Sequence, residues 1–227
     1  MSCLCLALDV PTLEEAERLV GRTAQVFDVY KVGLELFCAH GWDAVERVRA
    51  AGATAIFLDL KLHDIPRTVA KSIARMEGKG VDFLTVHLAG GRSMLEESQK
   101  QAQSVGVRLL GVSVLTSLDR SDLATIGLSS TIEMNVTRRC HLASEMGLFG
   151  VVSSPQEAMM IKRDVSSDLF CVTPGIRFAD DGLGDQKRIM TPRRAIEQGA
   201  DMLVIGRSVT QAVDMDRALS RLQEVKS

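Results

Sequence analysis

The chain has 227 residues, enough for one large domain or two small ones, and its 46% of apolar residues can fill a sizeable core. Its formal net charge of −2, with one Trp and one Tyr, gives no electrostatic or stacking case for a nucleic acid or an anionic membrane as partner. No apolar run approaches the ~18 residues of a membrane span, and the first residues lack the basic start of a signal peptide.

The five cysteines are odd in number and irregular in spacing. Cys3 and Cys5 lie two residues apart on an expected strand, which is not the ligand spacing of a zinc site. We interpret all five as small buried hydrophobes in a reducing compartment. A cytoplasmic protein is therefore expected.

Short apolar or β-branched runs alternate with amphipathic stretches along the whole chain. The expected strands are residues 4–9, 29–33, 54–59, 83–87, 108–115, 149–153, 169–173 and 202–206. Helical spacing is clearest at 13–20, where Thr12 and Glu15 form a capping-box pattern, and at 44–51. Glycines stand where helices should end, at Gly52, Gly80, Gly106, Gly147 and Gly199. Eight such units predict a closed (β/α)8 barrel, the TIM-barrel architecture, as a single catalytic domain over residues 1–227.

Two loop-like segments, 116–130 and 175–188, are long and rich in Ser, Asp and Gly. Both follow the C-terminal ends of expected strands, where a barrel builds its active site. The polar, glycine-bearing segment 175–188 is a candidate lid.

Residues 59–68 read Asp-Leu-Lys-Leu-His-Asp-Ile-Pro-Arg-Thr and end an expected buried strand. Side chains alternate along a strand, so Asp59 and Lys61 are predicted to face the same side. Asp64 follows in an expected loop, and Pro66 stands where a helix can begin. Burying several charges is costly unless they are paired or functional, and a structural salt bridge to the lysine would need only one carboxylate. The second carboxylate therefore indicates a functional role for this group of charges. An ion-pair cluster at the surface is the alternative.

The other expected strands also end in polar residues, and in a barrel these ends converge on one mouth. They supply Asp9, Lys31, His87, Thr116, Arg177 and the run Gly206-Arg207-Ser208. Barrels often bind phosphate after strands seven and eight, and a guanidinium can contact phosphate with two donors, so Arg177 and Arg207 predict a phosphate site. Considered alone, Asp9 could be a turn-forming residue before Pro11, and Lys31 could pack its methylene groups over the end of its strand. We expect His87 to orient its neighbours rather than to react.

Six motifs occur in order along the chain. They are Leu-Ala-Leu-Asp at 6–9, Tyr-Lys-Val-Gly at 30–33, Asp-x-Lys-x-x-Asp-Ile-Pro-x-Thr at 59–68, Val-Leu-Thr-Ser at 114–117, Thr-Pro-Gly-Ile-Arg at 173–177 and Val-Ile-Gly-Arg-Ser at 204–208. Together they resemble the orotidine 5′-phosphate decarboxylase family, most closely its bacterial branch. The resemblance implies a homodimer that converts orotidine 5′-phosphate to UMP without metal or cofactor, the last step of de novo pyrimidine synthesis.

The same resemblance implies roles for individual residues. Lys61 would protonate C6 of the pyrimidine, with Asp59 beside the departing carboxylate and Lys31 holding the charged chain. Asp64 would complete that chain in the neighbouring subunit's site, near Thr68. Substrate contacts are implied for Asp9 and Lys31 at the ribose, Thr116 near the base, Gln186 between base and phosphate, and Arg177, Gly206 and Arg207 at the phosphate.

The residue types suit this chemistry because loss of CO₂ from C6 leaves negative charge on carbon, which a fixed ammonium can stabilise where no electron-sink cofactor is bound. Two other functions stay open. One is a metal-dependent phosphosugar decarboxylase or aldolase on the same barrel, against which the Ile-Pro-x-Thr extension argues. The other is a catalytically silent nucleotide-phosphate sensor, which would have little need for Lys61, Asp59 and Asp64.

Overall fold

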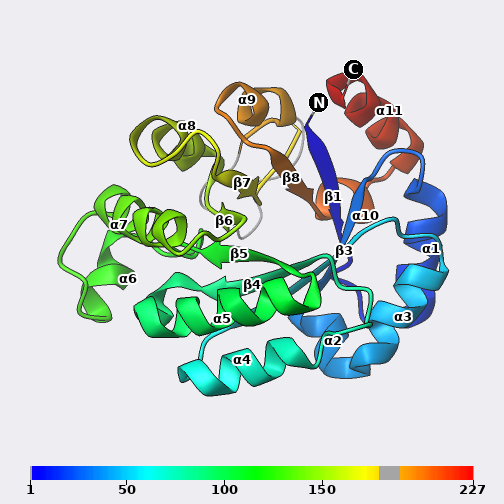
Figure 1. Ribbon diagram of the computed structural model, residues 1–227. Helices are drawn as coiled ribbons and strands as arrows, with labels where there is room; N and C mark the ends of the chain where they lie inside the picture. Colours follow the sequence, from blue (N-terminus) through cyan, green and yellow to red (C-terminus); the bar gives the residue numbers. More distant parts are fainter. Residues whose placement is uncertain (1, 179–189, 227) are drawn as a thin grey trace.

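Eight parallel strands form one closed barrel in the computed structural model, which describes residues 2–178 and 190–226 (Figure 1). The strands are β1 (Cys3–Ala7), β2 (Val29–Gly33), β3 (Ile56–Leu62), β4 (Phe83–His87), β5 (Arg108–Val112), β6 (Gly150–Val152), β7 (Phe170–Thr173) and β8 (Met202–Ile205). Each strand pairs with its neighbours in sequence, and β8 pairs with β1 to close the sheet. The predicted (β/α)8 barrel is confirmed.

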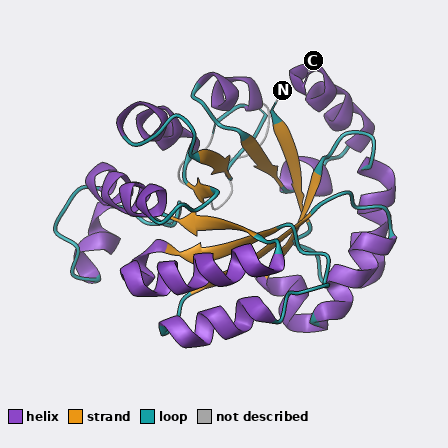
Figure 2. Cartoon of the chain, viewed as in Figure 1, coloured by secondary structure: helices purple, strands orange, loops and turns teal. Residues whose placement is uncertain are grey.

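Helices surround the strands on the outside of the barrel (Figure 2). They are α1 (Leu13–Thr23), α2 (Leu34–His40), α3 (Trp42–Ala50), α4 (Pro66–Ala74), η1 (Leu88–Gly90), α5 (Gly91–Val105), α6 (Arg120–Thr125), α7 (Ile132–Glu145), α8 (Pro155–Asp164), α9 (Pro192–Glu197), α10 (Arg207–Thr210) and α11 (Met215–Lys226). Within the described part of the chain, no helix is long and apolar enough to cross a membrane.

The apolar strand runs are buried on both faces, as parallel strands covered by helices require. A smaller cluster fills the barrel interior and includes Phe57, Phe83 and Met202. A larger cluster lies between the sheet and the helices and includes Leu6, Leu58 and Leu84. Because full burial of one such side chain contributes about 1.5–3 kcal/mol, these two layers hold the strand ends in fixed positions.

Local signals set several helix ends. Thr12 Oγ1 accepts a hydrogen bond from Glu15 N at 3.3 Å at the start of α1, and Pro66 occupies the first turn of α4. The predicted terminating glycines all have positive φ, for example 73° at Gly106, a conformation that costs glycine little.

Several expected bounds differ from the structure, and among them β1 ends at Ala7 instead of at residue 9. Strand β3 continues to Leu62 instead of ending at 59, and β5 ends at Val112 instead of continuing to 115. The segment 116–130 contains α6, which begins at an Asp119 cap. Most of the expected lid at 175–188 lies outside the described residues, and so does Gln186.

Candidate active site

Strand β3 is bulged where it carries its charges. Leu58 pairs with Leu84 and Leu62 pairs with Val86, so residues 59–61 stand opposite the single residue Thr85. In the described chain Lys61 is the one residue other than glycine with positive φ, at 50°. This left-handed conformation costs roughly 1–2 kcal/mol, which the surrounding contacts must offset.

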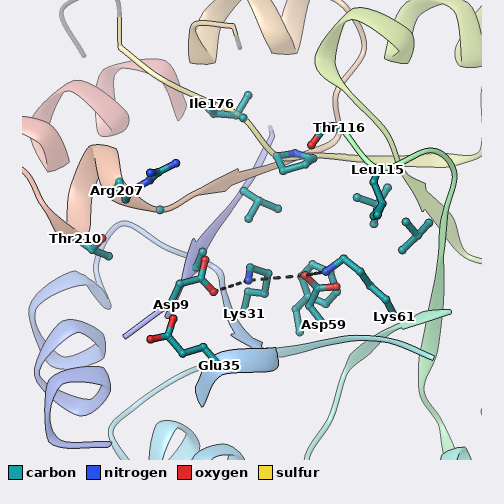
Figure 3. Close-up of a pocket in the computed structure, with 18 of the residues that line it drawn as sticks. Asp9, Lys31, Glu35, Asp59, Lys61, Leu115, Thr116, Ile176, Arg207 and Thr210 are labelled. Atoms are coloured by element: carbon teal, nitrogen blue, oxygen red, sulfur yellow. Dashed lines mark hydrogen bonds and ion pairs between the residues drawn. The ribbon is translucent and has the colours of Figure 1, made fainter. Parts of the chain in front are cut away.

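Four alternating charges form a chain across the mouth of the barrel. Lys31 Nζ lies 2.9 Å from Asp9 Oδ1 and 3.8 Å from Asp59 Oδ2. Lys61 Nζ donates to Asp59 Oδ2 at 2.8 Å, so Asp59 and Lys61 face the same side as strand alternation predicted. Figure 3 shows the four side chains in a row along one side of a pocket.

The middle of this chain is buried and its ends are open. The side chains of Lys31 and Asp59 are 11% and 13% exposed, whereas those of Lys61 and Asp9 are 33% and 54% exposed. A buried charge is tolerated when opposite charges surround it, and each central group has two such neighbours. The exposed ends leave the Lys61 ammonium accessible to a molecule in the pocket.

Electrostatics keep both central groups ionised. Burial alone would lower the pKa of Lys31, but the carboxylates of Asp59 and Asp9 outweigh it and raise that pKa above its ordinary value. Burial likewise opposes ionisation of Asp59, yet Lys31 and Lys61 hold the pKa of its carboxyl below its ordinary value. Lys31 and Asp59 are therefore both charged at neutral pH.

A pocket of about 550 Å³ opens at the C-terminal ends of the strands. Eight predicted residues line it: Asp9, Lys31, Asp59, Lys61, Thr116, Arg177, Gly206 and Arg207. Across the pocket from the charged chain lie Arg207 and Thr116 (Figure 3). The lining also includes apolar residues, among them Phe57 and Val204. The pocket thus has a row of alternating charges on one side and a cationic end at Arg207 on the other, with apolar residues also in its lining.

Asp64 and Thr68 lie apart from this pocket. They border a second cavity of about 330 Å³, and Lys61 borders both cavities. Asp64 is exposed, and its Oδ1 accepts a hydrogen bond from Ile65 N at 2.7 Å. Within one chain, Asp64 therefore does not close the charged chain from its far side.

His87 has a structural contact. Its Nδ1 accepts a hydrogen bond from Ala89 N at 3.2 Å at the start of η1, and its ring stacks on His63 with centroids 5.1 Å apart. Burial, with the nearby charges of His63, Arg139 and Lys61, lowers the pKa of His87 to about 4. A neutral imidazole fits the orienting interpretation.

Sequence reasoning gave no role to three residues at the site, of which Gly33 alone belongs to one of the six motifs. Thr85 is fully buried in β4 and contacts both Asp59 and Lys61. Glu35 lines the pocket next to Asp9 (Figure 3). Gly33 passes so close to the charged chain that a Cβ there would lie 2.9 Å from both Asp9 Oδ1 and Lys31 Nζ. Gly33 ends β2, and that place was the available signal for it, whereas Thr85 lies in the middle of β4, where sequence alone gives no sign of a role at the site.

Comparisons with known proteins agree on one family. The family model described as "Orotidine 5'-phosphate decarboxylase / HUMPS family" matches residues 2–222. Relatives named "Orotidine 5'-phosphate decarboxylase" include those from Thermobifida fusca, 44% identical over 96% of this chain and 93% of the relative, and Sphingopyxis alaskensis, 45% identical over 98% of each. A crystal structure of the enzyme of that name from Lactobacillus acidophilus superposes with a TM-score of 0.85, with 30% identity over 99% of both chains.

Proposed function

The chain belongs to the orotidine 5′-phosphate decarboxylase / HUMPS family, and on that premise we propose that it converts orotidine 5′-phosphate to UMP and carbon dioxide. The observation that carries the proposal is the charged chain in which Lys61 Nζ, held 2.8 Å from Asp59 Oδ2, remains accessible from the pocket. The catalytic site would then belong to a single barrel domain over residues 1–227.

The polarity of the pocket suggests how the substrate would lie. Its phosphate would bind at the cationic end, with Arg177 and Arg207, where Gly206 brings the backbone close. The ribose would contact Asp9 and Lys31, and the base would lie near Thr116. Gln186, which lies outside the described residues, is proposed to bridge base and phosphate on family resemblance alone.

The reaction breaks the bond between C6 and the carboxylate, and the electron pair stays on C6. Lys61, a cation beside that carbon, would stabilise the developing charge and then give its proton to C6. Lys61 would be left neutral and regain a proton from water. The ionised Asp59 would repel the substrate carboxylate, a repulsion that disappears as CO₂ leaves.

We assign the larger share of rate enhancement to charge stabilisation and positioning. Enzymes generally lower barriers by ~8–23 kcal/mol, more than one lysine can supply. Binding of the remote phosphate would contribute by holding C6 against Lys61, since binding energy far from the reacting atoms can fix geometry.

Turnover in the presence of a chelator tests this proposal. Purified protein with orotidine 5′-phosphate and EDTA is expected to show loss of the substrate absorbance with formation of UMP. Absence of turnover would refute the proposed function. Activity that EDTA abolishes and a divalent metal restores would favour the metal-dependent decarboxylase or aldolase.

The variant Lys61→Ala, compared with wild type, distinguishes an enzyme from the nucleotide-phosphate sensor. An enzyme loses turnover in this variant, whereas a sensor has no turnover in either form and only its binding of UMP can be measured. Wild-type binding of UMP without any decarboxylation would support the sensor.

We also propose a homodimer in which Asp64 and Thr68 complete the partner's site. Support comes from the second cavity, which is lined by Lys61 together with Asp64 and Thr68. Next to Asp64, the large apolar residue Ile65 is 68% exposed, as expected for a residue that a partner subunit covers. Mixing Lys61→Ala with Asp64→Ala chains should restore about a quarter of wild-type activity, because in a symmetric dimer half the molecules are mixed and each mixed dimer has one intact site. Mixed dimers without activity would place Asp64 outside the site.

The setting proposed for this reaction is the final step of pyrimidine nucleotide synthesis in the cytoplasm. All five cysteines are free, which fits a reducing compartment. The expectation that all five are buried is wrong for Cys38, which is exposed, and for Cys3, which is half-buried. Detection of the activity in the cytosolic fraction of the source cells checks this assignment.

A further inference from the structure

Thr85 contacts two members of the charged chain from inside the barrel wall. Its Oγ1 accepts a hydrogen bond from Lys61 N at 2.8 Å and donates one to Asp59 Oδ1 at 2.9 Å. The residue is fully buried, whereas Asp59 and Lys61 line the pocket. Thr85 therefore stands behind the charged chain and acts on the pocket only through these two residues.

The bulge in β3 explains why a side chain is needed there. Residues 59–61 face the single residue Thr85, so the regular ladder between β3 and β4 is interrupted at this point. An unpaired buried backbone N–H is costly, and the Thr85 hydroxyl accepts the one from Lys61. The same bond supports Lys61 in its left-handed conformation, with φ of 50°.

The proton inventory of the hydroxyl fixes the direction of the second bond. A threonine hydroxyl has one proton, and because Oγ1 accepts from Lys61 N, that proton is available for Asp59 Oδ1. Oδ1 is thereby occupied, and Oδ2 is the oxygen that faces both lysines, 2.8 Å from Lys61 Nζ and 3.8 Å from Lys31 Nζ. Rotation of the carboxylate would break the Thr85 bond.

We propose that Thr85 is a positioning residue for the decarboxylation, which orients the Asp59 carboxylate and the Lys61 backbone so that the Lys61 ammonium points at the reacting carbon. This inference rests on the proposed function. Misplacement of a reacting group by a fraction of an ångström weakens electrostatic stabilisation of the transition state. The residue acts on turnover and not on substrate affinity, since it is shielded from the pocket by the residues that it holds.

The experiment compares Thr85→Val with Thr85→Ser. Valine keeps the shape of the side chain but lacks the hydroxyl, and serine keeps the hydroxyl. We expect kcat of Thr85→Val to fall about 10- to 100-fold with little change in KM, because a hydrogen bond to a charged group contributes about 1.5–3 kcal/mol. Thr85→Ser should retain most of the wild-type kcat.

The pH profile supplies a readout that a merely structural role would not move. Burial raises the pKa of Asp59, and the charges of Lys31 and Lys61 lower it; the hydrogen bond from the Thr85 hydroxyl is a further contact that lowers it. Its removal should shift the acid limb of kcat to higher pH in Thr85→Val and leave that limb in place in Thr85→Ser.

A matched control is Thr23→Val in α1. Thr23 is also fully buried; its hydroxyl donates to Leu19 O at 2.7 Å and lies 3.0 Å from the Tyr30 hydroxyl, and neither of these partners lines the pocket. This variant should lose stability without loss of kcat. If Thr85→Val does not fold, Thr85→Cys replaces it, since a thiol of similar size is only a weak donor and the same fall in kcat is expected.

Each outcome has one meaning. Wild-type protein without turnover refutes the proposed function. Active wild-type protein with an unchanged kcat in the variant that lacks the hydroxyl refutes the role of Thr85. A loss expressed only in KM, or an equal loss of kcat in Thr85→Ser, also refutes it.

Discussion

The substitution Gly33→Ala tests how tightly the charged chain is packed. Gly33 ends β2 with φ of −93°, a conformation that alanine adopts freely, so no backbone strain is introduced. The added Cβ would lie 2.9 Å from Asp9 Oδ1 and 2.9 Å from Lys31 Nζ. One of these charged atoms must move by several tenths of an ångström.

The energetic cost of Gly33→Ala depends on how exposed the Asp9–Lys31 ion pair is to solvent. The Lys31 side chain is 11% exposed, but that of Asp9 is 54% exposed, so water screens part of their interaction. We therefore expect the substitution to weaken the Asp9–Lys31 interaction by about 1–2 kcal/mol, which is near the lower end of the range for hydrogen bonds between charged groups. That corresponds to a fall of about 5- to 30-fold in kcat/KM.

The assay is kcat/KM for orotidine 5′-phosphate, followed by absorbance with EDTA present. Gly21→Ala in α1 is the matched control, because a Cβ there meets nothing within 4 Å. It should keep full activity and gain up to about 1 kcal/mol of stability from the better helix former. Wild-type kcat/KM in Gly33→Ala would show that the Asp9–Lys31 contact is not needed in its observed geometry.

Three further predictions concern the phosphate, the histidine and the fold. Arg207→Ala should raise KM about 10- to 100-fold, because a charged contact to phosphate is lost. With orotidine, which lacks the phosphate, wild type and variant should not differ, and an unchanged KM for orotidine 5′-phosphate would contradict the phosphate assignment. His87→Gln keeps an acceptor for Ala89 N, and because the pKa of His87 is about 4 the imidazole is already neutral above pH 5, so the kcat profile from about pH 5 to 9 should match wild type. An ionisation near pH 6.5 that disappears in His87→Gln would contradict this. Gly150→Ala should lower Tm by on the order of 5 °C, since its Cβ would clash with the backbone oxygen of Phe170, and an unchanged Tm in a thermal melt would refute the close packing of β6 on β7.

Patterns with a local cause were predictable from the sequence. The glycines that end helices, the cap at Thr12 and Pro66 at the start of α4 depend on backbone chemistry within a few residues. The barrel followed from the repeated alternation of strand and helix, and convergence of the strand ends followed from the barrel. The placement of Asp9, Lys31, Asp59 and Arg207 around one pocket therefore needed no long-range information beyond the fold.

Features that depend on contact between strands were not predictable. The bulge that extends β3 to Leu62 is defined by its register against β4, which no spacing within β3 reveals. Thr85 reads as an ordinary β-branched strand residue until that register places it opposite Lys61. Glu35 and Gly33 are similar cases, since their importance comes from the proximity of Asp9 on another strand end.

The central claim is that the Lys61 ammonium stabilises and protonates the carbon that loses CO₂. Its most direct test is kcat for CO₂ release by Lys61→Ala, with Lys79→Ala, at a half-buried lysine over the Trp42 ring, as control. The account predicts a fall of at least about 1,000-fold for Lys61→Ala, with UMP binding retained and the control unaffected. A Lys61→Ala variant that releases CO₂ within about tenfold of the wild-type rate would contradict it.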